Sequence, residues 1–277
     1  MDPVQLILLG FGVLAVLLIA GYLVARRRTA EGAERSQLQV RFMALAFLLL
    51  LAFTGFQHWR IQDLMSETSV IEKFHWLWYY KPDTWREQKW AGVPVGQQPL
   101  DTWIHQEIIS EVQPDVIVET GTWKGGSALI WAMILNQFKP DGRVVTVDLY
   151  DHGIEAKKLP AWKNVDFIQG SSTDPKVVED IRKRIEGKKA LFILDSVHSK
   201  EHVLAELAAY APMVPVGSYI IVQDCNLNGH PVLPNTGPGP MEAVEEFLSK
   251  NDQFTSDRSR ERFLFTFCPK GYLKRVK

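Results

Sequence analysis

The chain has 277 residues, of which 46% are hydrophobic and 23% are charged, and its formal net charge at pH 7 is −1. This length and apolar content predict one catalytic domain of ordinary size plus an appendage. The balanced charge supplies no overall positive field, so no nucleic-acid partner is expected. Two cysteines, Cys225 and Cys268, are too few for a disulfide framework.

Two apolar runs lie at the N-terminal end. Residues 4–25 form a nearly uninterrupted run of about 22 residues, enough for the ~20 needed to cross a bilayer. Asp2 precedes this run and arginines follow it, which is the reverse of a signal peptide, so it is expected to stay as an anchor. The second run, 42–58, is either a second span or a helix lying in the membrane interface. We therefore predict a membrane anchor over residues 1–60 and a catalytic domain over 61–277.

An aromatic segment follows at residues 73–85. Trp76, Trp78, Tyr79 and Tyr80 are either an interfacial belt or a wall on which a substrate stacks. The alternative is a helix that packs on the catalytic domain.

From residue 100 onward, helix and strand patterns alternate. A helix is predicted over 100–112, ending before Pro114. Buried strands are predicted over 116–118, 144–147, 165–168, 191–194 and 219–222, with a helix over 202–210 between the last two. The alternation predicts an α/β fold with a Rossmann-like, doubly wound, mainly parallel sheet. The segment 263–267, with Gly271 and Tyr272 beyond it, fits a terminal antiparallel hairpin.

The first two strands carry the pattern of a nucleoside-binding crevice. The first ends in Glu119 and enters a turn with Gly121, Gly125 and Gly126 before an apolar helix, and the second ends in Asp148. Glycines in such a turn let the backbone approach a ligand, and the helix N-terminus favours anionic groups. An acid at the tip of the next strand is where such sheets hold ribose hydroxyls.

The turn departs from two well-known nucleotide motifs. Trp123 stands where a dinucleotide fingerprint needs glycine, and Lys124 lies too early for a phosphate-binding loop. An acid before the first glycine suits a cationic or hydroxyl-rich ligand better than a pyrophosphate. S-adenosylmethionine has both an amino group and a ribose. The alternative is a strand–turn–helix unit that binds no ligand.

Six collinear blocks make a family resemblance specific. They are the segments 92–109, 114–129, 169–175, 194–224, 228–248 and 260–276. On these blocks the last two-thirds of the chain resembles the cephalosporin hydroxylase / rhamnosyl O-methyltransferase family, whose members carry the class I methyltransferase fold. The resemblance implies S-adenosylmethionine as cofactor. The residues then expected to contact it are Glu119, Gly121, Thr122, Gly125, Gly126, Ser127, Asp148, Ser171 and Ser172.

Acids at the tips of the fourth and fifth strands predict a metal site. Asp195 and Asp224 end neighbouring strands, so both carboxylates could bind one Mg²⁺, which keeps several waters and needs few protein ligands. The resemblance implies Asp195, Gln223 and Asp224 as the metal region, and it implies an acid at the position of Gln223. Because Gln223 stands in place of an acid, the site has one negative charge fewer and should bind the ion more weakly. The alternative is that these acids only cap helices or contact the cofactor.

Two histidines are candidates for catalytic or substrate roles. His198 lies in the loop after Asp195, where it could accept a proton from a substrate hydroxyl, or act as a structural hydrogen-bonding group. His230 lies in a Pro/Gly-rich stretch long enough for a lid, and it either contacts substrate or orders that loop. The zinc-like pattern from His198 to His202 and the iron-like pair His105 and Glu107 are interpreted as chance matches.

These features together predict a membrane-anchored, S-adenosylmethionine-dependent O-methyltransferase that acts on a sugar hydroxyl of a glycolipid or lipid-linked glycan. The alternatives are an oxygenase, which the family label suggests, and a non-catalytic membrane module. The bilayer and the saccharide substrate are the expected partners, and a homo-oligomer is an open option.

Membrane orientation is a point of conflict. Five arginines between the apolar runs favour a cytoplasmic loop, and two full spans would then place the catalytic domain outside the cell membrane. One span with an interfacial second helix, or a hairpin that violates the charge rule, keeps this domain in the cytoplasm. Because the methyl donor is cytosolic, we expect an inner-membrane protein with a cytoplasmic catalytic domain.

Overall fold

The computed structural model describes residues 18–24, 27 and 32–277, and the chain divides into two compact units, Met1–Ser69 and Val70–Lys277. Most of the span predicted over 4–25 lies outside the described residues. The predicted domain boundary, after residue 60, precedes the division between the units by nine residues, inside a continuous helix.

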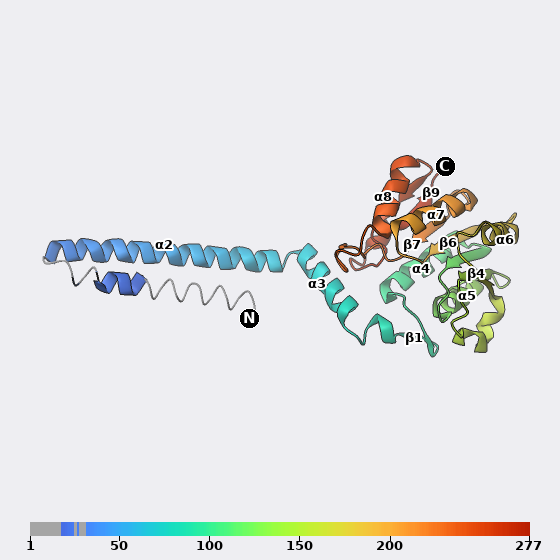
Figure 1. Ribbon diagram of the computed structural model, residues 1–277, viewed down its shortest axis with the longest axis horizontal. Helices are drawn as coiled ribbons and strands as arrows, with labels where there is room; N and C mark the ends of the chain where they lie inside the picture. The colour runs from blue at the N-terminus through green and yellow to red at the C-terminus, as the bar shows by residue number, and fades with distance from the viewer. Residues whose placement is uncertain (1–17, 25–26, 28–31) are drawn as a thin grey trace. The chain divides into compact units, whose positions relative to one another are not determined.

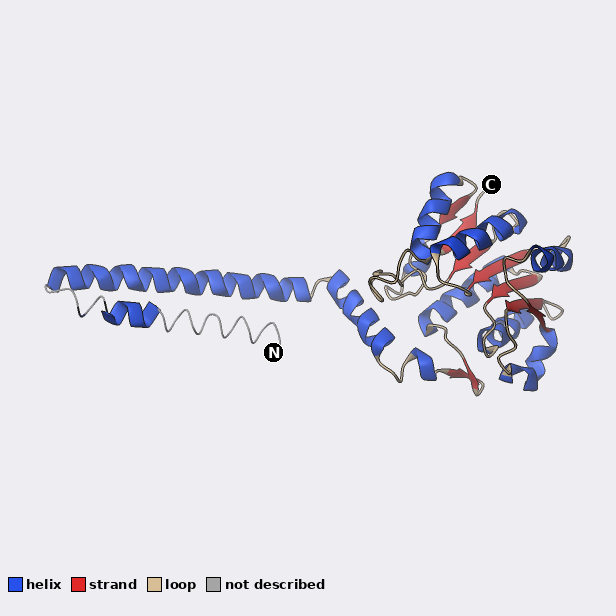
Figure 2. Cartoon of the chain, in the orientation of Figure 1, coloured by secondary structure: helices blue, strands red, loops and turns tan. Residues whose placement is uncertain are grey.

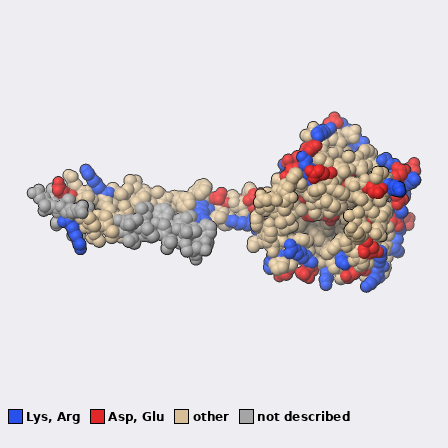
Figure 3. Space-filling view, viewed as in Figure 1, with Lys and Arg blue, Asp and Glu red and all other residues tan. Residues whose placement is uncertain are grey.

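One long helix dominates the first unit (Figure 1). Helix α2 runs from Gly32 to Leu64, so the apolar run 42–58 is the middle of a much longer helix. Its segment Ser36–Leu64 is long and apolar enough to cross a membrane, with a mean hydropathy of 1.9 in its most apolar window and none of that window buried. Charged atoms lie toward the two ends of this helix (Figure 3). The Tyr22 ring contacts that of Phe42 at 5.0 Å, so the described turns before residue 25 lie beside α2.

The second unit is built on a seven-stranded sheet with helices on both faces (Figures 1 and 2). The strands lie in the order β5-β4-β3-β6-β7-β9-β8, and only the contacts of β9 with β7 and β8 are antiparallel. The strands are β3 (Val116–Thr120), β4 (Arg143–Asp148), β5 (Val165–Gln169), β6 (Ala190–Leu194), β7 (Tyr219–Val222), β8 (Phe254–Ser256) and β9 (Tyr272–Arg275). The predicted doubly wound, mainly parallel sheet is confirmed.

Five helices pack on the two faces of the sheet: α4 (Pro99–Val112), α5 (Gly126–Phe138), α6 (Pro175–Ile185), α7 (Lys200–Tyr210) and α8 (Pro240–Lys250). Helix α3 (Glu67–Tyr80) crosses the division between the units and contacts Phe265 through Phe74 and His75. A short hairpin of β1 (Lys89–Trp90) and β2 (Val93–Pro94) precedes α4. Several helices begin at strong local signals: Asp174 accepts a hydrogen bond from the amide of Lys176 at the start of α6, and Ser199 begins α7 in the same way.

Alternating strand residues divide the core between the two faces. Val116 and Val118 join the apolar cluster that α6, α7 and α8 cover. Ile117, between them, belongs to the opposite cluster, which α4 and α5 cover. Parallel strands that are buried on both faces need continuous apolar runs, and such runs are what predicts the positions of these five strands from the sequence. Their carboxyl ends therefore meet at one edge.

The predicted terminal hairpin is correct in kind but its first strand was misplaced. The hairpin pairs β8 with β9, whereas the segment 263–267 is a turn. Its Phe267 amide donates a hydrogen bond to the buried carboxylate of Asp101 at 2.7 Å, and Phe265 packs edge-on against Phe74 of α3. Side-chain packing, and not strand pairing, accounts for the alternating apolar residues of this segment.

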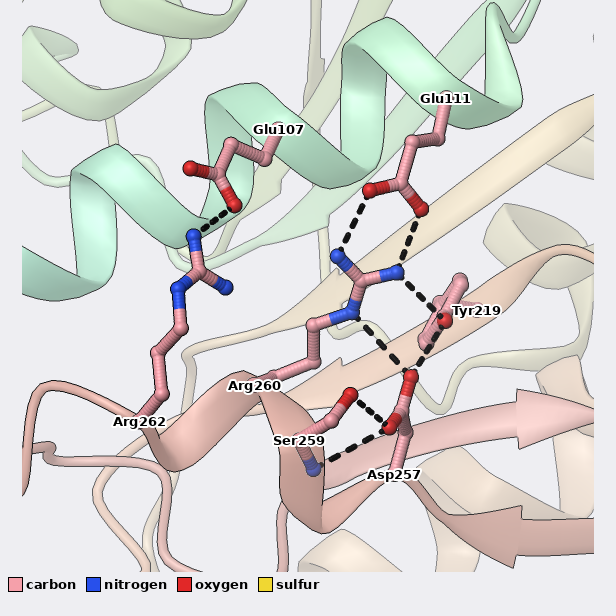
Figure 4. Close-up of polar contacts among 7 residues, drawn as sticks. All are labelled: Glu107, Glu111, Tyr219, Asp257, Ser259, Arg260 and Arg262. Atoms are coloured by element: carbon pink, nitrogen blue, oxygen red, sulfur yellow. Dashed lines mark hydrogen bonds and ion pairs between the residues drawn. The ribbon is translucent and has the colours of Figure 1, made fainter.

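Ion pairs fix this turn and the preceding residues on α4 (Figure 4). Arg260 is buried and binds both carboxylate oxygens of Glu111, and it also donates hydrogen bonds to Asp257 and to the Tyr219 hydroxyl. Arg262 pairs with Glu107 one helical turn earlier. Two points of attachment thus hold the 258–267 segment against α4.

Candidate active site

A cavity of about 370 Å³ lies at the carboxyl ends of the parallel strands. Residues that follow β3, β4, β5, β6 and β7 all contribute to its wall. Of the predicted site residues, those lining it are Gly121, Thr122, Gly126, Ser127, Asp148, Ser171, Ser172, Asp195 and Asp224. One edge of the sheet thus brings together side chains that lie more than a hundred positions apart.

The turn after β3 passes unusually close to the tip of β6. Gly121 has a φ of +87°, and a Cβ atom there would lie 2.0 Å from the carbonyl oxygen of Asp195. The amide of Asp195 donates a hydrogen bond to the Thr120 carbonyl at 3.0 Å. Only glycine provides both this backbone conformation and this clearance, so Gly121 fixes Asp195 against the turn.

Glu119 does not reach the cavity, contrary to its predicted role as a cofactor contact. It is fully buried, and its oxygens accept hydrogen bonds from the Trp131 indole at 2.8 Å and the Thr146 hydroxyl at 2.6 Å. Burial raises the pKa of Glu119 to about 7, with these hydrogen bonds acting in the opposite direction. Thr146 also lies 2.7 Å from the Thr122 hydroxyl. When Glu119 is ionised, Thr146 donates to it, so Thr122 donates to Thr146 and remains an acceptor toward the cavity.

Gly125 is likewise behind the cavity wall and not on it. It has a φ of +80° and precedes α5, and a Cβ there would lie 2.6 Å from the Ile154 side chain. Its role in this structure is close packing. Asp148, by contrast, faces the cavity as predicted, and its carboxylate accepts hydrogen bonds from the amides of Trp123 at 2.9 Å and Tyr150 at 3.2 Å.

Asp195, His198 and Asp224 form a compact cluster. Their potential ligand atoms all lie within 4.8 Å of one another, and His198 Nε2 is 3.0 Å from Asp224 Oδ2. The pKa of Asp195 is well above its usual range because of burial and the nearby Asp224 charge. Burial acts to lower the pKa of His198, but the hydrogen bond and charge of Asp224, with Asp195, outweigh it and raise the pKa to about 9. Two carboxylates crowded together fit a hard cation, because oxygen ligands of this kind are those that Mg²⁺ prefers.

The Gln223 side chain bonds to residues other than the two acids, and its predicted place in the metal region stays a prediction. Its side chain is buried, and its amide nitrogen donates to Gln97 Oε1 at 2.9 Å while its oxygen accepts from Cys268 Sγ at 3.0 Å. Gln97 Nε2 in turn donates to Asp195 Oδ2 at 2.7 Å. The amide at position 223 therefore acts through Gln97 on Asp195, and His198 takes the third place beside the two acids.

His230 is paired away from the cavity. Its Nε2 lies 2.7 Å from Glu242 Oε1, and the other Glu242 oxygen accepts from the Gly239 amide at the start of α8. It is not among the described residues that line the cavity. This geometry favours the loop-ordering alternative for His230 over substrate contact.

Among the polar wall residues that sequence reasoning missed are Gln97, Ser196 and His202. His202 Nε2 lies 3.1 Å from the Ser172 hydroxyl, and the Ser196 hydroxyl donates to the buried carboxylate of Glu206 at 2.7 Å. Gln97 lies in the matching segment 92–109, but no local motif marks it, because its partner Asp195 is 98 residues away.

The two chance metal patterns are not assembled in the part of the chain that the structure describes. His105 is fully buried with its pKa lowered to about 3 by desolvation, while Glu107 pairs with Arg262 on the far side of the helix turn. His202 contacts Ser172, as described above, and takes no part in the cluster of Asp195.

The fold and the site define the class of protein. A sheet with one antiparallel strand inserted next to its edge, a glycine turn after β3, and an acid at the tip of β4 are the features of class I methyltransferases, which bind S-adenosylmethionine at this edge. Residues 82–276 match the family Rhamnosyl O-methyltransferase/CmcI, and the chain belongs to this family of O-methyltransferases.

Comparisons with known proteins agree with this assignment. A rhamnosyl O-methyltransferase of Mycobacterium bovis (strain BCG / Pasteur 1173P2) is 40% identical over 215 residues, which cover 75% of this chain and 85% of the relative. That of Mycobacterium leprae (strain TN) is 37% identical and covers 75% and 91%. The solved structures "CmcI-N160 apo-structure" and "cmcI-D160 Mg-SAM" each superpose with a TM-score of 0.53 at 20% identity. They cover 69% of this chain and 77% and 78% of theirs, and support the fold.

Proposed function

We propose that this protein is a membrane-anchored methyltransferase that transfers a methyl group from S-adenosylmethionine to a sugar hydroxyl of a glycolipid or lipid-linked glycan. The observation that carries the chemistry is the cluster of Asp195, His198 and Asp224 at the edge of a cavity whose opposite wall carries Asp148.

The cavity residues fit the two polar ends of this cofactor. S-adenosylmethionine supplies an electrophilic methyl group on its sulfonium. Asp148 offers carboxylate oxygens for ribose hydroxyls, and Thr122 offers an acceptor for the amino group. Ser171 and Ser172 follow β5 and line the same space. A volume of about 370 Å³ falls within the range for small-molecule sites.

Asp195 and Asp224 would hold Mg²⁺, which when bound orients substrate oxygens and lowers the pKa of a hydroxyl. The mutual crowding of the two carboxylates supports this, since two acids at one site are stabilised by a cation between them. A solved structure with the same fold is described as "cmcI-D160 Mg-SAM".

His198 is the group best placed to accept the hydroxyl proton. It touches Asp224 at 3.0 Å and is partly exposed next to the cavity. Its pKa of about 9, which Asp224 and Asp195 raise, keeps it protonated at pH 7 when no cation is bound. A cation on those carboxylates offsets their charge and lowers this pKa, so that the neutral imidazole required of a base becomes available.

The substrate class and the membrane placement have separate support. The named relatives are rhamnosyl O-methyltransferases, which supports a sugar acceptor. The exposed apolar segment Ser36–Leu64 supports an anchor and thus a lipid-linked acceptor. Access to the cytosolic methyl donor supports a cytoplasmic catalytic unit at the inner membrane.

The two alternative functions, an oxygenase and a non-catalytic membrane module, have less support. An oxygenase would need an assembled iron triad, and the described residues do not bring His105 and Glu107 together with a further ligand. A non-catalytic module would not require the acids Asp148, Asp195 and Asp224, all of which face the site.

Calorimetry on the purified chain in detergent tests the cofactor assignment. S-adenosylmethionine should bind, and Asp148→Ala should weaken binding by roughly 1.5–3 kcal/mol, the usual cost of hydrogen bonds to a charged group. Glu155→Ala, on a short helix outside the cavity wall, is the control with unchanged affinity. A folded protein that takes up no cofactor would rule out the proposal.

A further inference from the structure

Helix α3 has apolar residues on both of its faces. Ile71, His75, Trp78 and Tyr79 recur at helical spacing and form the less exposed face. The other face carries Val70, Phe74, Trp76, Leu77 and Tyr80, all substantially exposed, with Leu77 at 67%. A helix on the surface of a protein in water normally turns a polar face outward, whereas one that is apolar all round is covered on both sides.

The inner face of α3 is occupied by the 263–267 turn. His75 lies 4.4 Å from the Phe265 ring, measured between centroids, and Trp78 lies 5.8 Å from the same ring. Desolvation lowers the pKa of His75 to about 4, so it is neutral in this packing. Phe263 and Leu264 of the same turn are themselves exposed.

These exposed residues form one surface, which we call the α3 patch: Val70, Phe74, Trp76, Leu77, Tyr80, Phe263 and Leu264. Its two segments touch, because Phe74 contacts Phe265 at 4.7 Å. The 263–267 turn is fixed in place, because Arg260 and Arg262 form ion pairs with Glu111 and Glu107 of α4 (Figure 4). Glu72 and Lys73 of α3 are also exposed, so charged side chains border the apolar residues of the patch. Among the described residues, contacts at the rim of this surface are the hydrogen bond from the Leu233 amide to the Tyr80 hydroxyl at 3.0 Å and the Arg262 guanidinium 4.9 Å over the Phe263 ring.

We infer that the α3 patch binds the headgroup–acyl boundary of a lipid bilayer, and so holds the catalytic unit on the membrane surface from which it takes its acceptor. This rests on the proposed anchor and deepens it. Only Met65 and Ser66 separate α2 from α3, so the chain can place their ends no more than about 11 Å apart. If α2 crosses the bilayer, α3 must begin at its surface.

The residue types in the patch agree with this occupant. Trp and Tyr rings concentrate at membrane–water interfaces, where an apolar ring and a polar edge are both satisfied. Trp76 and Tyr80 stack at 4.7 Å on the exposed side, with Leu77 and Phe74 beside them as fully apolar groups. An interfacial helix of this composition inserts its apolar face to a depth of about 5–10 Å.

A site-specific probe tests the inference on the full chain. Both native cysteines are fully buried, so Leu77→Cys can be labelled selectively with an environment-sensitive nitrobenzoxadiazole dye. The control is Val216→Cys, which is similarly exposed at 62% and remote in sequence from the patch. Each protein is reconstituted into phosphatidylcholine–phosphatidylglycerol vesicles, with and without nitroxide-labelled lipid, and vesicle sedimentation is measured in parallel.

The expected result is blue-shifted emission at position 77 that nitroxide lipids quench at least twofold, with water-like, unquenched emission at position 216. Sedimentation with vesicles but water-like emission at both positions would overturn the patch inference and leave the anchor intact. Failure to sediment would overturn the anchor and the inference together. Energy transfer between labelled copies without lipid quenching would assign the patch to a second copy of the chain, and would also reject the lipid.

Discussion

The chain of amides behind Asp195 gives a quantitative prediction. Cys268 donates to Gln223, Gln223 donates to Gln97, and Gln97 donates to Asp195. The acceptor-only carboxylate at one end and the thiol donor at the other fix the direction of both amides. Gln223 Nε2 also lies 3.4 Å from His105 Nε2. Gln97→Leu therefore removes two side-chain hydrogen bonds, Gln223→Leu removes three, and each leaves a buried polar atom with fewer partners.

The magnitudes follow from which bonds are lost. Gln97→Leu removes the hydrogen bond to the Asp195 carboxyl and leaves the buried Gln223 amide nitrogen with only its long contact to His105 Nε2, for a cost of about 3 kcal/mol in the free energy of unfolding. Gln223→Leu removes the amide bond to Gln97, the long contact with His105 and the weak thiol bond, and it leaves Gln97 Oε1 without a donor, for about 2 kcal/mol. The double variant leaves neither amide group behind without its partner and should cost about 3 kcal/mol, so the coupling free energy between the two substitutions is about 2 kcal/mol.

Urea unfolding of the full chain in detergent micelles, at pH 7.5 and without divalent ions, measures all three variants. The control cycle combines Gln97→Leu with Tyr219→Phe, whose hydroxyl bonds to Asp257 and Arg260, and these two costs should add within about 0.5 kcal/mol. If the costs of Gln97→Leu and Gln223→Leu also add, the two amides do not share a bond and the assignment of Gln223 as a positioning residue is wrong.

Three further substitutions or conditions probe other parts of the structure. Gly121→Ala should abolish cofactor binding and lower stability by several kcal/mol, because its Cβ would lie 2.0 Å from the Asp195 carbonyl oxygen; calorimetry with S-adenosylmethionine checks this, and Gly153→Ala, which has open space and a similar φ, is the control. Arg260→Met should lower the free energy of unfolding, measured by thermal unfolding, by about 2–4 kcal/mol. This is less than for a fully buried ion pair, because Glu111 is 55% exposed. A loss under 1 kcal/mol would show that the contacts in Figure 4 do not hold this segment on α4. Chelation of divalent ions should abolish methyl transfer yet leave cofactor affinity within about threefold, and Asp224→Asn should do the same; transfer that survives chelation would remove the metal from the proposal.

The sequence predicts the fold correctly where the local hydrophobic pattern matches the burial of the element in the folded protein. Val116 to Val118 and Leu191 to Leu194 are buried on both faces of the sheet, so their continuous apolar runs marked them as parallel strands. The segment 263–267 also alternates apolar residues, but those residues pack on α3 and make no strand. Alternation alone cannot separate these cases, because both need an apolar residue at every second position.

The sequence predicts only part of the site, because it indicates where strands end but not which way their side chains point. Asp148, Asp195 and Asp224 stand at strand ends, and topology alone brings strand ends together. Side-chain direction is a separate matter: Glu119 points to Trp131 and Thr146, and Gln223 points to Gln97. No local pattern records which partner a strand-tip side chain selects, because those partners come from other elements.

The central claim is that this protein methylates a sugar hydroxyl of a membrane glycolipid. Mass spectrometry of glycolipids from cells that contain the protein, lack it, or carry Asp195→Ala tests this claim most directly. One glycan class should gain the mass of a single CH₂ on its sugar only with the intact protein, and the label from methyl-deuterated methionine should appear in it. Identical glycolipid spectra in all three strains, with the protein present and folded in the membrane fraction, would contradict the claim.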